Sequence, residues 1–373
     1  MPHRLRLTLL SLLLLPGVVL AGRMPYSNLY IFGDSLSDIG NSYLATTADG
    51  QDPPSPDPTY YPLPGHFLND AGNDGIGDSY GEVMWRALNL PGELAPGLAG
   101  GTDYAVGGAR SRYGEADMTG AVGSRVPPAL ADMPSRDAAS AGSLWGQLNA
   151  YLPTSASVAD ADALYIVMIG GNDVRDIATL QNLGSAEATG LFTQSVGDVV
   201  AGILELIGAG ARNVVVPTVP DLGLTPEALA FDAASPGVSA ALSSLTTAYN
   251  DAVVSTLNAQ LAALTGVDDL NLWYLDTFDR LQDIVEDPAR FGLANVTDAC
   301  LTGYFVETDT DPTGDPSLCS NPESYAFYDR VHPTSTVHAI LADDFLAAVP
   351  APATAVLMLG ALPGLAMKRR RRR

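Results

Sequence analysis

Residues 28–41 read NLYIFGDSLSDIGN, and this stretch gives the strongest indication of the fold. Its first five residues form a short apolar run without alternation, which is typical of a strand buried on both faces of a parallel sheet. The run ends at Gly33-Asp34-Ser35, where the glycine permits a tight turn. A helix that followed the turn would aim backbone N–H groups at a developing negative charge. Ser35 is therefore a candidate nucleophile at a strand end.

Three further apolar runs follow along the chain, and polar residues come directly after each. They are 163–169 (ALYIVMI), 213–216 (NVVV) and 270–275 (LNLWYL). Between and after these runs, apolar residues recur at helical spacing and predict helices at 143–152, 193–207, 238–264 and 333–348. Strands that alternate with helices predict an α/β layer fold around a parallel sheet, with the active site beyond the carboxyl ends of the strands. Two long loops, 49–77 and 118–141, are candidates for a substrate-facing or lid role.

Histidine is scarce enough to narrow the search for a base. Beyond residue 22 the chain has only His66, His332 and His338. The spacing Asp329-x-x-His332 lets one loop carry both an imidazole and a carboxylate that fixes its tautomer. His338 lies on the expected last helix and is interpreted as structural. His66, in the Gly/Pro-rich loop, is a candidate contact for substrate.

Four segments, in order along the chain, resemble the sequence blocks of the GDSL (SGNH) hydrolases. They are 32–41 (FGDSLSDIGN), 104–109 (YAVGGA), 169–173 (IGGND) and 329–334 (DRVHPT). Residues 65–69 (GHFLN) resemble a further family segment less closely. The resemblance spans residues 29–345. It departs from the family pattern at Asp103, where an asparagine is usual, and at Leu68, where a serine is usual.

The resemblance implies a flavodoxin-like three-layer α/β/α sandwich with a central parallel sheet. It also implies a serine ester hydrolase that needs no cofactor and no metal. Ser35 would attack the ester carbonyl, His332 would take its proton, and Asp329 would orient His332. The N–H groups of Ser35 and Gly108 and the side-chain amide of Asn172 would bind the oxyanion. We interpret Asp38 and Asn41 as residues that cap or turn the start of the first helix, and Asp173 as one that ties down its loop.

The two ends of the chain resemble sorting signals. Residues 1–22 combine two arginines, an apolar run and small residues near Ala21, which is the layout of a secretory signal peptide. The hydrolase domain is expected at 23–348. Residues 349–373 combine VPAP, an apolar segment and a basic cluster, and resemble the PEP-CTERM tails of Gram-negative bacteria, with Ala351 where that family usually has glutamate. We therefore expect export, a transient membrane contact through the tail and recognition by a sorting protease; an ordinary C-terminal anchor is the alternative.

Cys300 and Cys319 are the only cysteines. In an exported chain they are expected to form a disulfide, and without nearby histidines they make a poor zinc site. The alternative is a pair of free thiols.

The composition excludes some partners and leaves several functions open. The net charge is −23, and the basic residues gather at the two ends, so the domain between is more acidic still. Such a surface repels phosphate backbones, which argues against a nucleic acid partner. A small-molecule or lipid ester is the expected substrate. An esterase or lipase leads, and phospholipase, acyltransferase, carbohydrate deacetylase and a non-catalytic surface or matrix protein remain alternatives.

Overall fold

The computed structural model describes residues 26–69, 79–112, 142–152, 158–180, 183–267, 269–303 and 316–349. Its centre is a parallel sheet in the order β1-β2-β3-β4. The strands are β1 (Leu29–Gly33), β2 (Leu164–Met168), β3 (Asn213–Pro217) and β4 (Asn271–Leu275). Each coincides with one of the apolar runs of the sequence. The expected parallel α/β fold is confirmed.

The free edge of β1 is covered by residues 102–106, which run parallel to it. The N–H of Ile31 donates to the carbonyl of Thr102 (3.1 Å), the N–H of Tyr104 donates back to Ile31 (2.8 Å), and the N–H of Val106 donates to Gly33 (3.1 Å). The chain therefore leaves β1 on one side and returns on the other as β2. This reversal of direction makes the carboxyl end of β1 the switch point of the sheet, where open α/β folds bind ligands.

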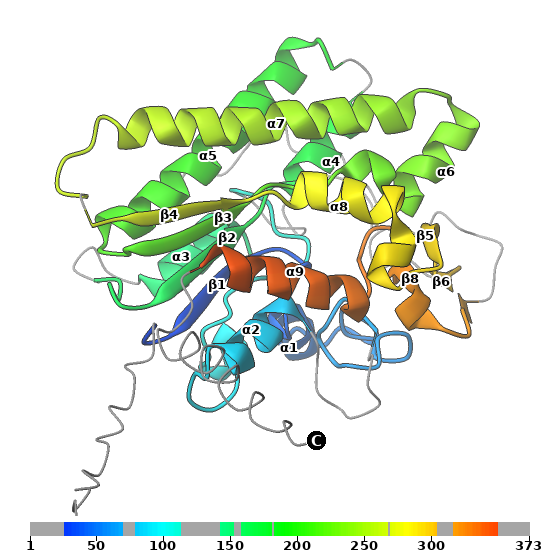
Figure 1. Ribbon diagram of the computed structural model, residues 1–373, viewed down its shortest axis with the longest axis horizontal. Helices are drawn as coiled ribbons and strands as arrows, with labels where there is room; N and C mark the ends of the chain where they lie inside the picture. The colour runs from blue at the N-terminus through cyan, green and yellow to red at the C-terminus, as the bar shows by residue number, and fades with distance from the viewer. Residues whose placement is uncertain are drawn as a thin grey trace, which may run out of the picture.

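Helices cover both faces of the sheet and give three layers (Figure 1). Tyr165 and Val167 of β2 join the core beneath the helices on one face, whereas Leu164, Ile166 and Met168 join the core on the other. The first face carries α3 (Leu144–Tyr151), α4 (Gly171–Thr179), α5 (Ala186–Gly208), α6 (Pro226–Ala234) and α7 (Val238–Leu261). The second carries α2 (Tyr80–Ala87) and α9 (Ser335–Ala348).

The remaining elements lie around the carboxyl end of the sheet. They are α1 (Asn41–Ala48), α8 (Thr277–Glu286), the short helices η1 (Gly97–Ala99), η5 (Leu222–Leu224), η6 (Pro288–Phe291) and η7 (Pro322–Ser324), and four short strands. Strands β5 (Asn295–Ala299) and β8 (Tyr325–Phe327) pair in parallel, and β6 (Leu301–Thr302) and β7 (Ser317–Leu318) pair antiparallel.

Cys300 and Cys319 form a disulfide bond in the structure. Cys300 is buried in a small cluster with Tyr61, Leu301 and Tyr328, so the bond anchors the segment that leads into the loop of His332.

Two local expectations differ from the structure. Helix α5 begins at Ala186, seven residues before the expected start, because Ser185 caps it by accepting from the N–H of Ala188. No helix begins at Ser35: residues 35–37 form a turn, and α1 starts at Asn41.

Some expectations fall on residues outside those described. They are the leader 1–22, the tail beyond Val349, and loop 118–141. Among the described residues, only α5 is long and apolar enough to cross a membrane; 56% of its most apolar window is buried inside the molecule, as in the core helix of a globular domain.

Candidate active site

Ser35, His332 and Asp329 lie in hydrogen-bonding contact at the carboxyl end of β1. The Nε2 atom of His332 is 2.7 Å from Ser35 Oγ, and its Nδ1 atom is 2.6 Å from Asp329 Oδ2. His332 and Asp329 are buried, whereas Ser35 is half-buried and remains reachable. The geometry is that of a nucleophile, a base and an orienting carboxylate.

The loop that carries His332 is shaped by Asp329. Its Oδ1 atom accepts from the N–H groups of Val331 (2.8 Å) and His332 (2.7 Å). The N–H of Tyr328 donates to the carbonyl of His332 (2.8 Å), which closes the turn. One carboxylate thus folds the loop with one oxygen and orients the imidazole with the other.

Tyr61 is a contact of Asp329 that the sequence did not indicate. Its hydroxyl donates to Asp329 Oδ2 at 2.5 Å, across a separation of 268 residues, and the tyrosine is fully buried. Burial opposes the charge of Asp329, but the contacts with His332, Tyr61 and Val331 outweigh it and hold the pKa of this carboxyl below its ordinary value. Asp329 is therefore ionised beside the imidazole.

The segment 61–69 packs against the loop of His332; the sequence placed it in a long loop and matched residues 65–69, less closely, to a family segment. Besides Tyr61, the ring of Phe67 lies 5.0 Å from the imidazole of His332, and Asn69 Oδ1 accepts from the N–H of Ser335 (3.0 Å). Leu68, one of the two departures from the family pattern, is buried. This part of the loop supports the base.

His66, in the same segment, faces groups of the protein itself. Its Nε2 atom is 3.2 Å from Glu82 Oε2 and its Nδ1 atom is 3.4 Å from the carbonyl of Pro64. Burial lowers the pKa of His66, but Glu82 outweighs burial and the pKa lies above its ordinary value. A contact with substrate, as the sequence suggested, stays a prediction.

His338 lies on α9, as expected. Its Nδ1 atom accepts from the N–H of Tyr80 (3.3 Å), and burial lowers its pKa to about 3. It is a neutral residue of the core.

The turn that presents Ser35 leaves no room for a side chain at Gly33. A Cβ atom there would lie 2.4 Å from the carbonyl oxygen of Met168 on β2. Gln147 of α3 clamps the same glycine, accepting from its N–H (2.9 Å) and donating to its carbonyl (2.8 Å). The side chain and carbonyl of Asp34 accept from the N–H groups of the next residues, so the turn is held from both sides.

The three donors that the resemblance assigned to the oxyanion each have a hydrogen available for a ligand. Within the described part of the chain, the N–H groups of Ser35 and Gly108 donate to no acceptor. Asn172 Nδ2 gives one hydrogen to the carbonyl of Ala109 (3.0 Å), which leaves its second hydrogen for a ligand. Arg175, one turn further along α4, donates to Asn172 Oδ1 (3.3 Å) and so fixes which face of the amide carries the donors.

Buried carboxylates hold the segment of Gly108 in place. Asp38 Oδ1 accepts from the N–H groups of Gly40 (2.8 Å) and Asn41 (2.7 Å), which is the expected turn before α1. Its Oδ2 atom also accepts from the N–H of Gly107 (2.8 Å), a contact between distant segments that the sequence did not indicate. Burial raises the pKa of Asp38.

Asp103, the residue that departs from the family pattern, is fully buried. Its two oxygens accept from the N–H groups of Ile39 (3.2 Å) and Ala105 (2.9 Å). Burial, with the nearby charge of Asp38, raises its pKa well above the ordinary value. The change from asparagine is thus accommodated by backbone donors alone.

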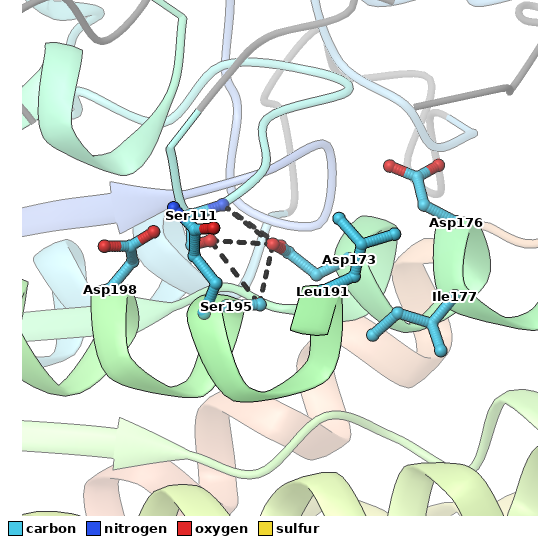
Figure 2. Close-up of a pocket in the computed structure, with 8 residues that line it drawn as sticks. Ser111, Asp173, Asp176, Ile177, Leu191, Ser195 and Asp198 are labelled. Carbon is cyan, nitrogen blue, oxygen red and sulfur yellow. Dashed lines mark hydrogen bonds between the residues drawn. The ribbon is translucent and has the colours of Figure 1, made fainter. Parts of the chain in front are cut away.

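Asp173 ties down the other side of this segment, as expected. It accepts from the N–H (3.0 Å) and hydroxyl (2.7 Å) of Ser111 and from the hydroxyl of Ser195 (2.7 Å), and Figure 2 shows these bonds converging on its carboxylate. Burial raises the pKa of Asp173 to about 6. The buried ion pair of Arg110 with Asp176 (2.8 Å) adds a second tie next to it. Among the described residues, no three acidic, histidine or cysteine side chains are arranged to hold a metal ion.

Comparisons with known proteins give matches to esterases and lipases. The sequence model of the GDSL-like lipase/acylhydrolase family matches residues 29–345. A GDSL esterase/lipase of Arabidopsis thaliana is 27% identical over 332 residues, which cover 84% of each chain. Esterase EstA of Pseudomonas aeruginosa is 30% identical over 356 residues, or 89% of this chain and 48% of that one, so the chain spans about half the length of that relative. Among solved structures, a catalytic mutant of the acetylxylan esterase Axe2 of Geobacillus stearothermophilus matches with a TM-score of 0.39 and 13% identity, over 86% of this chain and 93% of that one.

Proposed function

Since the chain belongs to the GDSL-like lipase/acylhydrolase family and is a serine ester hydrolase, we propose that it cleaves carboxylic esters through an acyl-enzyme formed on Ser35. The observation that carries the proposal is the continuous line of contacts from Ser35 Oγ through His332 to Asp329. The ionised Asp329 keeps the proton of the neutral imidazole on Nδ1, which leaves Nε2 as the base.

The reaction has two steps on the same residues. Ser35 Oγ bonds to the ester carbon while His332 Nε2 takes the proton of the hydroxyl. The carbonyl oxygen becomes negatively charged and is stabilised by hydrogen bonds from the N–H groups of Ser35 and Gly108 and from the side-chain amide of Asn172. The C–O bond to the alcohol then breaks, and His332 returns the proton to the leaving oxygen. A water molecule, deprotonated by His332, then attacks the acyl carbon. The C–O bond to Ser35 breaks, His332 returns the proton to Ser35 Oγ, and the carboxylic acid leaves.

We also propose that the enzyme is exported from a Gram-negative cell and works at its surface, in its matrix or in its periplasm. The disulfide between Cys300 and Cys319 supports an oxidising compartment. Residues 1–22 are the proposed signal peptide. Residues 349–373 are the proposed PEP-CTERM-like tail, which would contact the membrane transiently and meet a sorting protease.

The test compares the wild type with Ser35→Ala on p-nitrophenyl acetate, with Ser37→Ala as the matched control in the same turn. The hydroxyl of Ser37 forms a hydrogen bond with the hydroxyl of Tyr80 and none with His332. The Ser37→Ala change should therefore alter kcat only a few-fold. Loss of Ser35 should lower kcat by about 10⁴ or more. A fluorophosphonate should label the wild type and Ser37→Ala at Ser35 but leave Ser35→Ala unlabelled. Equal turnover by all three proteins would refute the assignment, and no turnover by the folded wild type would favour a non-catalytic role.

A further inference from the structure

A large apolar groove lies on the helical face next to the active site. Its volume is about 540 Å³, and residues of α4, α6 and α7 line it together with η5. Most of the lining is aliphatic or aromatic, including Leu180, Leu222, Phe231, Leu242 and Leu245. The volume falls within the range of small-molecule sites, about 300–1,000 Å³.

One end of the groove is built from residues that touch the catalytic machinery. Val331 lines it and is the direct neighbour of His332. Arg175 also lines it and donates to the oxygen of Asn172. The N–H of Glu227, at the start of α6, donates to the carbonyl of Arg330 (3.0 Å), so α6 is fastened to the loop of His332.

A pair of oppositely charged side chains lies at this same end of the groove. Arg175 and Glu227 form an ion pair there (2.8 Å) and both are mostly buried. Most of the remaining lining is apolar, and two of its large apolar side chains stay in contact with solvent, Phe231 at 52% and Leu183 at 43% exposure. The groove therefore has an ion pair at the end where Arg175 contacts Asn172, and large apolar side chains elsewhere that water can reach.

We propose that this groove binds the acyl chain of the ester, so that the enzyme prefers medium- and long-chain esters to acetyl esters. The inference rests on the proposed function, because the carbonyl carbon bonded to Ser35 has to lie where Asn172 can reach its oxygen. A chain that leaves that carbon past Arg175 enters the groove and is removed from water. Specificity then resides in α4, α6 and α7 as well as in the long loops.

The size of the effect follows from apolar transfer. Burial of one methylene group is worth up to about a fourfold gain in kcat/KM. Esters that differ by several methylenes should therefore differ by at least tenfold as long as the chain still fits.

The experiment narrows the groove with a large side chain at one of its lining residues. Ala241 lines the groove from an exposed position on α7, so Ala241→Trp should narrow it without disturbing the core. Ala240, the adjacent residue, is also exposed but does not line the groove, and Ala240→Trp is the matched control. The kcat/KM values of the three proteins are measured on p-nitrophenyl acetate, butyrate, octanoate and laurate. Decyl acetate is added as a substrate whose long chain is on the alcohol.

The wild type should prefer octanoate to acetate by at least tenfold. Ala241→Trp should lose at least tenfold on octanoate and laurate but stay within threefold of wild type on acetate, and Ala240→Trp should match wild type throughout. A wild type that hydrolyses acetate best, a loss equal on all chain lengths, or a loss confined to decyl acetate would each overturn the groove assignment while ester hydrolysis stands. Absence of all Ser35-dependent turnover would instead be a failure of the proposed function.

Discussion

Asp329→Asn is the most informative single change at the proposed active site. The carboxylate accepts four hydrogen bonds: Oδ1 from two backbone N–H groups, at 2.8 and 2.7 Å, and Oδ2 from His332 Nδ1 at 2.6 Å and from Tyr61 at 2.5 Å. An asparagine in this place can keep its oxygen on the two N–H groups and so preserve the loop. Its NH₂ group then faces His332 Nδ1, where the carboxylate oxygen was.

The consequence is a change of tautomer. Because the asparagine donates to Nδ1, the imidazole proton moves to Nε2 and points at Ser35 Oγ, so His332 cannot take the proton of the serine. A wrong tautomer in a triad lowers kcat by about 10⁴, which corresponds to about 5.4 kcal/mol of transition-state stabilisation. KM should change little, since Asp329 is buried behind the imidazole.

Tyr61→Phe is the comparison that separates the tautomer from general loss of contacts. It removes one donor to Asp329 but leaves the bond to His332 Nδ1. We expect a loss of about 1.5–3 kcal/mol in the free energy of unfolding, as for a hydrogen bond to a charged group, and less than a tenfold loss in kcat at pH 8.

The assay measures kcat and KM on p-nitrophenyl butyrate at pH 8, with urea unfolding of each variant to establish that it is folded. A folded Asp329→Asn protein whose kcat stays within tenfold of wild type would refute the reasoning, since the tautomer of His332 would then not depend on Asp329. Equal losses of kcat in Asp329→Asn and Tyr61→Phe would refute it as well.

Three further predictions concern the donors and the supports around the site. Asn172→Ala should lower kcat by about 10²–10³ on p-nitrophenyl butyrate with KM nearly unchanged, because it removes one oxyanion donor; a rise in KM alone would contradict that role. The folded protein binds the proton of Asp173 more tightly than the unfolded chain, with a pKa of about 6 against 3.8, so this stabilisation is present below about pH 4 and is lost as the pH rises through 6. Urea unfolding should therefore show the stability of wild type relative to Asp173→Asn falling by roughly 3 kcal/mol between pH 3 and pH 7, and a gap independent of pH would exclude this titration. Replacing Cys300 and Cys319 together by serine should lower the free energy of unfolding by roughly 3 kcal/mol, and an unchanged urea midpoint would show that the bond adds no stability.

Strands β1, β2 and β3 could be predicted from the sequence because they are mostly buried, and the edge strand β4, which is only partly buried, still carries an apolar run. A continuous apolar run such as 163–169 has one explanation in a chain of this kind, and β2 lies inside it. The start of α5 at Ala186 was harder to place, because most of residues 186–190 are exposed and the buried Ala188 and Leu191 pack with Ile177 in a small cluster apart from the main core. The sequence suggested a helix directly after Ser35, and this was wrong. The side chain and carbonyl of Asp34 accept from the next N–H groups, and these hydrogen bonds form a turn in place of the first turn of a helix.

Some of the residues around Ser35 could also be predicted from the sequence, and others could not. Asp329 and His332 share one short loop, so their spacing is visible in the sequence. Tyr61 and Phe67 reach that loop from more than two hundred residues away, and nothing local marks them. Arg175 carries the one signal that could have been used, since it follows Asn172 at helical spacing and so lies one turn further along the same face.

The reversal of the chain at β1 explains why the proposed oxyanion donor Gly108 depends on a buried carboxylate. Residues 102–106 run beside β1, so the N–H groups of Gly107 and Gly108 emerge next to the turn of Ser35. The N–H of Gly107 donates to Asp38 and Ser42, whereas the N–H of Gly108, a residue with a φ of 73° that few others adopt readily, donates to neither. Burying Asp38 is unfavourable, as its raised pKa shows, and the backbone N–H groups it accepts are what offset that burial. An asparagine at residue 38 would keep one acceptor oxygen and place an NH₂ group against half of these donors, so the position of Gly108, and with it the oxyanion site, requires a carboxylate there.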